Sequence, residues 1–173
     1  MSQILVVPNP LLRKKSLPVE KIDKNAILFS KRMIKIMNSA PGVGLAAPQL
    51  GKLERIITIN IRKDNEMKDN SFALFNPSII SFSKKKIVLE EGCLSVPGQF
   101  AEIERSESIR VKYLNESSKE IEKEVSGFES RVIQHEVDHL EGRLFIDYLS
   151  PLKRNIMIKK VIKLEKVGNF ENK

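Results

Sequence analysis

Cysteine, histidine and long apolar runs are all scarce in this sequence. Its 173 residues include one cysteine, Cys93, and two histidines. A single cysteine cannot form an internal disulfide, which is typical of a protein in a reducing cytoplasm and leaves Cys93 as either a buried apolar side chain or a functional thiol. No apolar run approaches the ~18 residues of a membrane span, and the opening MSQILVVPNP does not resemble an export signal. We therefore expect a soluble cytoplasmic protein.

Acidic residues are too few to balance the basic ones. The 30 lysines and arginines against 22 aspartates and glutamates give a net charge of +8. Such a charge favours contact with a polyanion such as nucleic acid, although a lysine-rich composition alone gives the same value. The length favours one domain, residues 1–173, that buries its own core and is a monomer.

Both histidines lie in one short stretch, QHEVDHLEG at residues 134–142. In a helix, residues i and i+4 share a face, so His135 and His139 can bind one metal ion. In the HExxH pattern the intervening glutamate, here Glu136, is the base that takes a proton from water bound to the metal. The alternative is an amphipathic helix that carries histidine and glutamate on its surface.

The helix that carries this motif has recognisable ends. Ser126 and Glu129 fit a capping box, and Gly142 is placed to end the helix. Residues spaced along one face form a stripe that we expect to point inward: Phe128, Val132, His135 and His139.

The rest of the chain predicts two further helices and a set of short strands. Residues 24–38 fit an amphipathic helix capped by Asp23 or Asn25, and residues 151–167 fit a basic last helix. A proline-containing arm at residues 4–18 and a glycine-rich loop, PGVGLAAPQLG at 41–51, are expected to be irregular. A polar loop is expected at residues 62–71. Strands are predicted at residues 55–61, 72–75, 78–82, 87–95, 100–104, 108–113 and 119–125.

A catalytic metal site needs a third protein ligand beside the two histidines. The longer pattern HExxHxxGxxH fails at Phe145, and there is no third histidine. Glu165 would give a thermolysin-like peptidase site, and Cys93 would give a site of one thiolate and two imidazoles. We favour Cys93, because it follows a predicted strand whereas Glu165 lies among lysines on a helix expected to be peripheral. A basic RNA-binding protein with a structural zinc site is the non-enzymatic alternative.

Three motifs together resemble the signature motifs of peptide deformylases. They are GVGLAAPQ at 42–49, EGCLS at 91–95 and QHEVDHLEG at 134–142, in the family's order, and the resemblance extends from VPNP at 7–10 to FIDYLSPLKR at 145–154. It implies an α+β fold in which antiparallel or mixed β-sheets surround a central HExxH helix, with one helix near each terminus. It also implies a metal-dependent hydrolase that removes the formyl group from N-formylmethionine on nascent peptides and releases formate.

The resemblance also assigns residues to the reaction. It implies that the metal ligands are Cys93, His135 and His139. It implies that Glu136 is the general acid and base, and that the Gln49 side-chain amide and the Leu94 backbone N–H bind the oxyanion.

Substrate contacts are also implied by the resemblance. The peptide is expected to pair in extended form with residues 42–44 and with the strand before Cys93. The residues expected to bind substrate are Val43, Gly44, Leu89, Glu91, Gly92, Phe128 and Val132. An ion pair between Glu91 and Arg105 is expected to fix the cysteine loop. Arg131 and Phe100 stand where relatives often carry other residues, so they bear on the rim of the pocket.

The implied cofactor is one divalent metal ion, Fe²⁺ in cells, which Zn²⁺, Ni²⁺ or Co²⁺ can replace. The implied partners are N-formylmethionyl nascent peptides and the ribosome near its exit tunnel. Six basic residues on the last helix fit contact with RNA phosphates: Lys153, Arg154, Lys159, Lys160, Lys163 and Lys166. A solvated helix face is the alternative reading of that helix.

Overall fold

The computed structural model describes residues 4–61 and 70–166. The α-helices are α1 (Lys24–Ser39), α2 (Gly127–Leu140) and α3 (Pro151–Lys166). Short 3-10 turns occur at η1 (Pro10–Arg13), η2 (Ala47–Leu50) and η3 (Phe145–Tyr148). The strands are β1 (Gly44–Ala46), β2 (Ile56–Asn60), β3 (Ser71–Phe82), β4 (Lys86–Gly92), β5 (Phe100–Ser106), β6 (Ser108–Leu114) and β7 (Glu120–Ser126).

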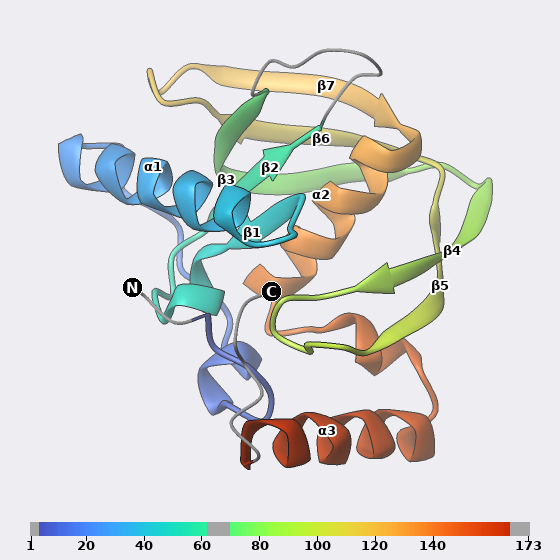
Figure 1. The fold of residues 1–173 in the computed structure, drawn as a ribbon. Coiled ribbons are helices and arrows are strands. Elements are labelled where there is room, and N and C mark those ends of the chain that lie inside the picture. Colours follow the sequence, from blue (N-terminus) through green and yellow to red (C-terminus); the bar gives the residue numbers. More distant parts are fainter. Residues whose placement is uncertain (1–3, 62–69, 167–173) are drawn as a thin grey trace.

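The strands form two antiparallel sheets with α2 between them (Figure 1). One sheet has the order β1-β2-β3-β6-β7, and the other is the hairpin of β4 and β5. Helix α2 contacts strands of both sheets, while α1 covers β1, β2 and β3. The predicted α+β fold around a central HExxH helix is therefore confirmed, and the named sheets are antiparallel and not mixed.

Three apolar clusters hold these layers together. The first lies between the five-stranded sheet and α2, and includes Ile57, Val111 and Ile133. The second, under α1, contains Met33 and Met37. The third joins the N-terminal arm to η3, β5 and α3 and is made of Val7, Leu12, Val96, Ile103, Leu144, Phe145, Ile146 and Val161. Because the arm contributes buried side chains to it, the arm is part of the core and not a surface covering.

The structure corrects several predicted features of the strands and helices. The glycine-rich loop at residues 41–51, expected to be irregular, contains the strand β1 and the 3-10 turn η2. Residues 71–82 form one strand, β3, and not two, because a bulge accommodates Asn76, with φ of 51°, and Pro77, which has no N–H to donate. Ser126 is the N-cap of α2, but its side chain makes no capping hydrogen bond. Glu129 instead pairs with Lys123 at 2.6 Å, so the predicted capping box does not form.

Other predicted boundaries are confirmed. The Asp23 side chain caps α1 by accepting a hydrogen bond from the Ala26 N–H at 2.9 Å. Gly142 follows α2 with φ of +71°, and a Cβ there would lie 2.5 Å from the Arg13 carbonyl oxygen, so only glycine fits. The predicted polar loop falls mostly in residues 62–69, and the predicted end of the last helix at residue 167; both lie outside the described residues. No helix in the described ranges is long and apolar enough to span a membrane.

Candidate metal centre

The thiol of Cys93 and the imidazoles of two histidines meet between α2 and the β4–β5 hairpin. Cys93 directly follows β4, and His135 and His139 lie one turn apart on α2. The potential ligand atoms all lie within 4.8 Å of one another, and Cys93 Sγ is 3.2 Å from His139 Nε2. Tetrahedral metal bonds of about 2.0–2.3 Å place such atoms roughly 3.5 Å apart. The donors and their spacing therefore fit one divalent metal ion.

The Glu91 carboxylate orients the first histidine. Its Oε2 atom lies 3.0 Å from His135 Nδ1, which leaves Nε2 of the ring to bind a metal. Arg105 donates from Nε to Glu91 Oε1 at 2.5 Å and from Nη2 to Oε2 at 3.0 Å, so the predicted ion pair is present. Burial alone would raise the pKa of Glu91, but hydrogen bonds from His135 and Arg105 and the charge of Arg105 lower it to about 2. Glu91 is therefore a carboxylate at neutral pH.

Glu136 lies beside the ligands in a nearly closed environment. Its side chain is buried, and its Oε2 atom has no hydrogen-bond partner among the described residues. Burial raises the pKa of Glu136 to about 7, against the lowering effect of the charges on His135 and Arg105. A pKa in this range suits a group that both accepts and donates a proton at neutral pH.

The backbone of Gly44 on β1 packs directly against Glu136. A Cβ at position 44 would lie 2.3 Å from Glu136 Oε1 and 2.9 Å from its Cγ. Glycine at this position therefore gives the buried carboxylate its space.

Gln49 reaches the site from η2, the short turn that follows β1. Its Oε1 accepts a hydrogen bond from the Ala46 N–H at 2.8 Å, which fixes which end of the amide faces Cys93. Its Nε2 donates to Ser95 Oγ at 3.0 Å and lies 3.7 Å from Cys93 Sγ. The N-terminal arm bonds both loops, from the Leu5 N–H to the Gln49 carbonyl and from the Val7 N–H to the Ser95 carbonyl. The loops that carry two of the three motifs are thereby tied together.

The residues predicted to bind substrate differ in exposure. Val43, Leu89 and Phe128 are 43%, 46% and 54% exposed, whereas Val132 is buried. The expectation that Phe128 points inward with the rest of its stripe is therefore wrong, because it lies at the start of α2, where it is exposed to solvent.

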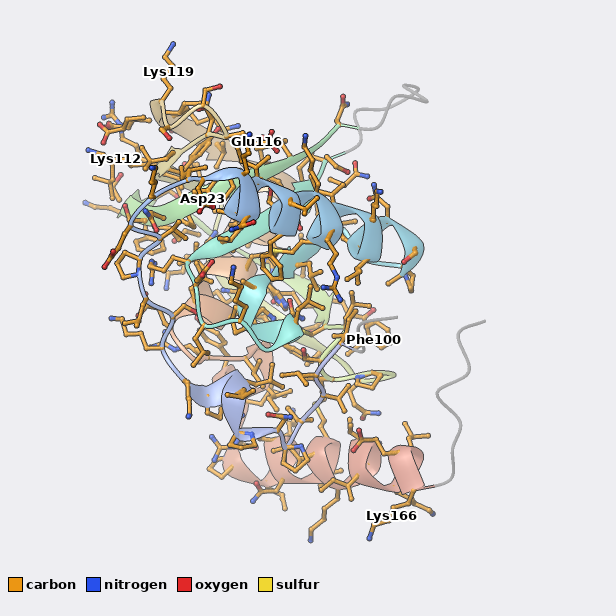
Figure 2. All side chains as sticks on the ribbon, turned by 90° about the vertical axis from the view of Figure 1, so that its left-hand side faces the viewer. Asp23, Phe100, Lys112, Glu116, Lys119 and Lys166 are labelled. Atoms are coloured by element: carbon orange, nitrogen blue, oxygen red, sulfur yellow. The ribbon has the colours of Figure 1, made fainter. Side chains whose placement is uncertain are left out.

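The β4–β5 hairpin positions the other predicted substrate contacts. Gly92 pairs with Phe100, whose ring lies over the glycine: a Cβ at position 92 would be 2.5 Å from the ring. Phe100 itself is 59% exposed on the hairpin (Figure 2). The Glu91 side chain is buried and faces α2, so only its backbone remains available to a substrate.

The alternative third ligand is not near the site. Glu165 is exposed on α3, and the group that could hold a metal within residues 4–61 and 70–166 is Cys93, His135 and His139. The preference for Cys93 over Glu165 agrees with this arrangement.

Three further residues contribute to the site. Ser95 accepts the Gln49 hydrogen bond, and Asp138 bonds Arg105 at 2.9 Å and the Tyr148 hydroxyl at 2.8 Å. Arg131 does not lie on the pocket rim: it is buried and bonds Glu91 at 2.6 Å. Position within the EGCLS motif could have identified Ser95, but the partners of Arg131 are about 30 to 40 residues away and leave no local signal.

Comparison with known proteins decides the family. The family model described as polypeptide deformylase matches residues 1–155. The chain belongs to the polypeptide deformylase family. Peptide deformylase of Mesorhizobium japonicum is 42% identical over 163 residues, which are 94% of this chain and 92% of that protein. That of Phenylobacterium zucineum is 44% identical over 166 residues, covering 96% and 98% of the two chains.

Solved structures of the family share the fold. The crystal structure of peptide deformylase from Ehrlichia chaffeensis in complex with actinonin has a TM-score of 0.90 and 39% identity, and the match covers 95% of this chain and 99% of that one. Peptide deformylases are metal-dependent hydrolases that remove the formyl group from N-formylmethionine on nascent peptides. The family and the activity that the three motifs implied are therefore confirmed.

Proposed function

We propose that this chain deformylates nascent peptides at a centre in which Cys93, His135 and His139 hold one divalent metal ion. The observation that carries the proposal is the meeting of these three ligands within 4.8 Å, next to a buried glutamate that follows the first histidine. When bound, the ion supplies a Lewis acid that lowers the pKa of a coordinated water toward ~7. The Cys93 ligand is a thiolate in this role, and both imidazoles are neutral.

Glu136 moves the proton in the proposed reaction. Its carboxylate takes a proton from the attacking water, whose oxygen forms a bond with the formyl carbon. The amide C–N bond then breaks, and Glu136 returns the proton to the departing amine, which leaves formate and a free N-terminus. The raised pKa of Glu136, about 7 as a result of burial, supports both halves of this exchange.

Gln49 and Leu94 are proposed to bind the oxygen that becomes negative. The Gln49 amide is held by Ala46 and Ser95, and its long contact to Cys93 Sγ leaves an N–H directed at the site. Leu94 follows the thiol directly, so its backbone N–H is close to the same point. Donors of this kind contribute roughly 3–4 kcal/mol each to the transition state by the mutational scale.

The substrate is proposed to bind as an added strand. The backbone from residue 42 to Gly44 and the strand that ends at Glu91 and Gly92 offer pairing groups on the two sides of the site. The exposed side chains of Val43, Leu89 and Phe128, together with the buried Val132, supply apolar surface for the methionine side chain. The exposure of Val43, Leu89 and Phe128, which leaves these apolar side chains accessible to a substrate, supports the assignment.

Iron is the proposed metal in cells, with Zn²⁺, Ni²⁺ or Co²⁺ as replacements. Thiolate and imidazole ligands suit all four of these first-row metals, so the donor set does not favour one of them. The preference for Fe²⁺ rests on the family resemblance.

The third ligand is tested by metal content and formate release in matched variants. Cys93→Ser should lose most of its metal and its formate release from formyl-Met-Ala-Ser, because the hydroxyl is a poor replacement for the thiolate. Glu165→Gln, the control, should keep both, because Glu165 is exposed on α3. The reverse pattern would support the thermolysin-like alternative.

Docking on the ribosome through α3 is the proposed partner interaction. Five exposed lysines line this helix, Lys153, Lys159, Lys160, Lys163 and Lys166, and Lys166 points away from the body of the protein (Figure 2). Such charges would contact RNA phosphates. The protein is further proposed to act as a cytoplasmic monomer, with residues 1–173 as one catalytic domain.

Removing α3 would not test this interaction cleanly, because Val161 is fully buried in the cluster with Val7 and Leu12. Changing Lys159, Lys160, Lys163 and Lys166 to glutamine removes four charges and leaves that packing intact. Co-sedimentation with ribosomes should weaken and lose part of its salt dependence. The matched control changes four exposed lysines on or beside α1, namely Lys21, Lys24, Lys31 and Lys35. Equal weakening in both variants would contradict docking through α3.

A further inference from the structure

The proposed metal ligands come from two separate parts of the fold, the β4–β5 hairpin and helix α2. Cys93 extends from the two-stranded β4–β5 sheet, whereas His135 and His139 lie on α2. A metal site needs its ligands held to a fraction of an ångström, so the connections between α2 and the hairpin determine its geometry.

Arg131 crosses from α2 to both strands of the hairpin. Its Nη1 donates to Glu91 Oε1 at 2.6 Å and to the Ile103 carbonyl at 3.0 Å, and its Nη2 donates to the Ile87 carbonyl at 2.6 Å. Glu91 and Ile87 belong to β4, and Ile103 belongs to β5. A planar guanidinium donates from separate nitrogen atoms in fixed directions, whereas the three N–H groups of an ammonium are on one rotating nitrogen.

Glu91 links Arg131 to the proposed metal ligand His135. Its Oε1 accepts from both Arg131 and Arg105, while Oε2 faces His135 Nδ1. Arg131 thus fixes the carboxylate that in turn orients the imidazole. This indirect contact is the arrangement by which residues behind a metal ligand control its position.

Arg105 makes a second connection between the hairpin and α2, but of a different kind. It lies on β5, so its bonds to Glu91 stay within the hairpin, and it reaches α2 through Asp138 at 2.9 Å. Without Arg131, Glu91 would still be paired with Arg105 and would not be an isolated buried charge. Loss of Arg131 should therefore disturb the site more than it disturbs the fold.

We propose that Arg131 is a positioning residue of the metal centre, which fixes the β4–β5 hairpin on α2 and orients His135 through Glu91. The inference rests on the metal site proposed above. Arg131 is not proposed to contact the substrate.

The test is a Co²⁺ titration of Arg131→Leu, followed through the absorption band of the thiolate–cobalt bond. We expect the affinity for Co²⁺ to fall by about 10- to 100-fold, as for other residues behind metal ligands, and the band at saturation to change. Arg131→Lys keeps the charge near Glu91 but lacks the rigid fork that spans the three acceptors, so it should be intermediate.

Arg55→Leu is the matched control. The Arg55 side chain is 13% exposed, pairs with Glu141 at 2.5 Å and donates to the Pro77 carbonyl at 2.9 Å. Like Arg131 it therefore makes both an ion pair and a bond to a backbone carbonyl, but its partners are neither metal ligands nor Glu91. It should lower the thermal midpoint and leave Co²⁺ affinity and the band as in the wild type.

Wild-type Co²⁺ affinity and an unchanged band in Arg131→Leu would overturn the inference, as would equal weakening in Arg55→Leu. If Arg131→Leu does not fold, Arg131→Lys decides: weakened affinity supports the role, and unchanged affinity overturns it. A wild-type protein without a thiolate–cobalt band would overturn the proposed metal site and this inference together. A negative result for Arg131 alone leaves the proposed deformylation standing, because the titration uses no substrate.

Discussion

Replacing Gly44 by alanine should reduce catalysis more than stability. The new Cβ would lie 2.3 Å from Glu136 Oε1, whereas ordinary contacts begin at 3.4 Å, so the carboxylate must withdraw by about 1 Å. The end of a glutamate side chain can move more readily than the backbone of β1. We therefore expect the Glu136 carboxylate to move and the backbone of β1 to stay in place. A displacement of this size can cost about 100-fold in rate, or about 2.7 kcal/mol of transition-state stabilisation.

The effect on folding should be smaller than the effect on catalysis. Overpacking costs about 1–3 kcal/mol, and the lower backbone entropy of unfolded alanine offsets about 0.4–1 kcal/mol of it. We therefore expect the free energy of unfolding to fall by about 1 kcal/mol, and by no more than about 2.6 kcal/mol.

The assay compares kcat, KM and metal content in the wild type and Gly44→Ala. Displacement of Glu136 predicts a lower kcat with unchanged metal content, because the three atoms nearest to the new Cβ all belong to Glu136. A change confined to KM would instead point to impaired pairing with the substrate. A kcat within threefold of the wild type would refute the inference that Gly44 gives Glu136 its position.

Two further predictions concern the polar groups around the ligands. Gln49→Leu should lower kcat by about 10²–10³-fold with metal content unchanged, because it removes one oxyanion donor but no ligand; an unchanged kcat would contradict that role. Folding lowers the pKa of Glu91 from 4.5 to about 2, so its charge contributes fully above pH 4.5, and that contribution is lost as the pH falls toward 2. In urea unfolding with a chelator present, the wild type should lose on the order of 3 kcal/mol more than Glu91→Gln between pH 5 and pH 2, and parallel losses would contradict this.

Local spacing made the helical part of the site predictable. His135, Glu136 and His139 depend on their positions within one helix, and the helical period fixes those positions. Cys93 and Gln49 lie about 40 and 90 residues earlier in the chain, and their approach to α2 follows from the sheets and not from any local pattern. Only the three motifs taken together indicated that these residues meet.

The wrong predictions arose where distant contacts outweigh local preference. Glu129 fits a capping box by sequence, but Lys123 on β7 pairs with it. Asn76 and Pro77 look like a break between strands, yet the Asn76 side chain bonds both the N–H and the carbonyl of Val19, so β3 continues through a bulge. Arg131 has three acceptors from two strands that lie outside its own helix. No pattern of neighbouring residues encodes such contacts.

Formate release by the wild type and by Glu136→Ala tests the central claim most directly. Both proteins would be loaded with the same metal and given formyl-Met-Ala-Ser, and metal content would be measured in each. The wild type should release one formate for each free N-terminus formed, and Glu136→Ala should retain its metal and lose at least about 100-fold in rate. A variant that retains its metal and releases formate at the wild-type rate would contradict the role of Glu136, and a metal-loaded wild type that releases no formate would contradict deformylation itself.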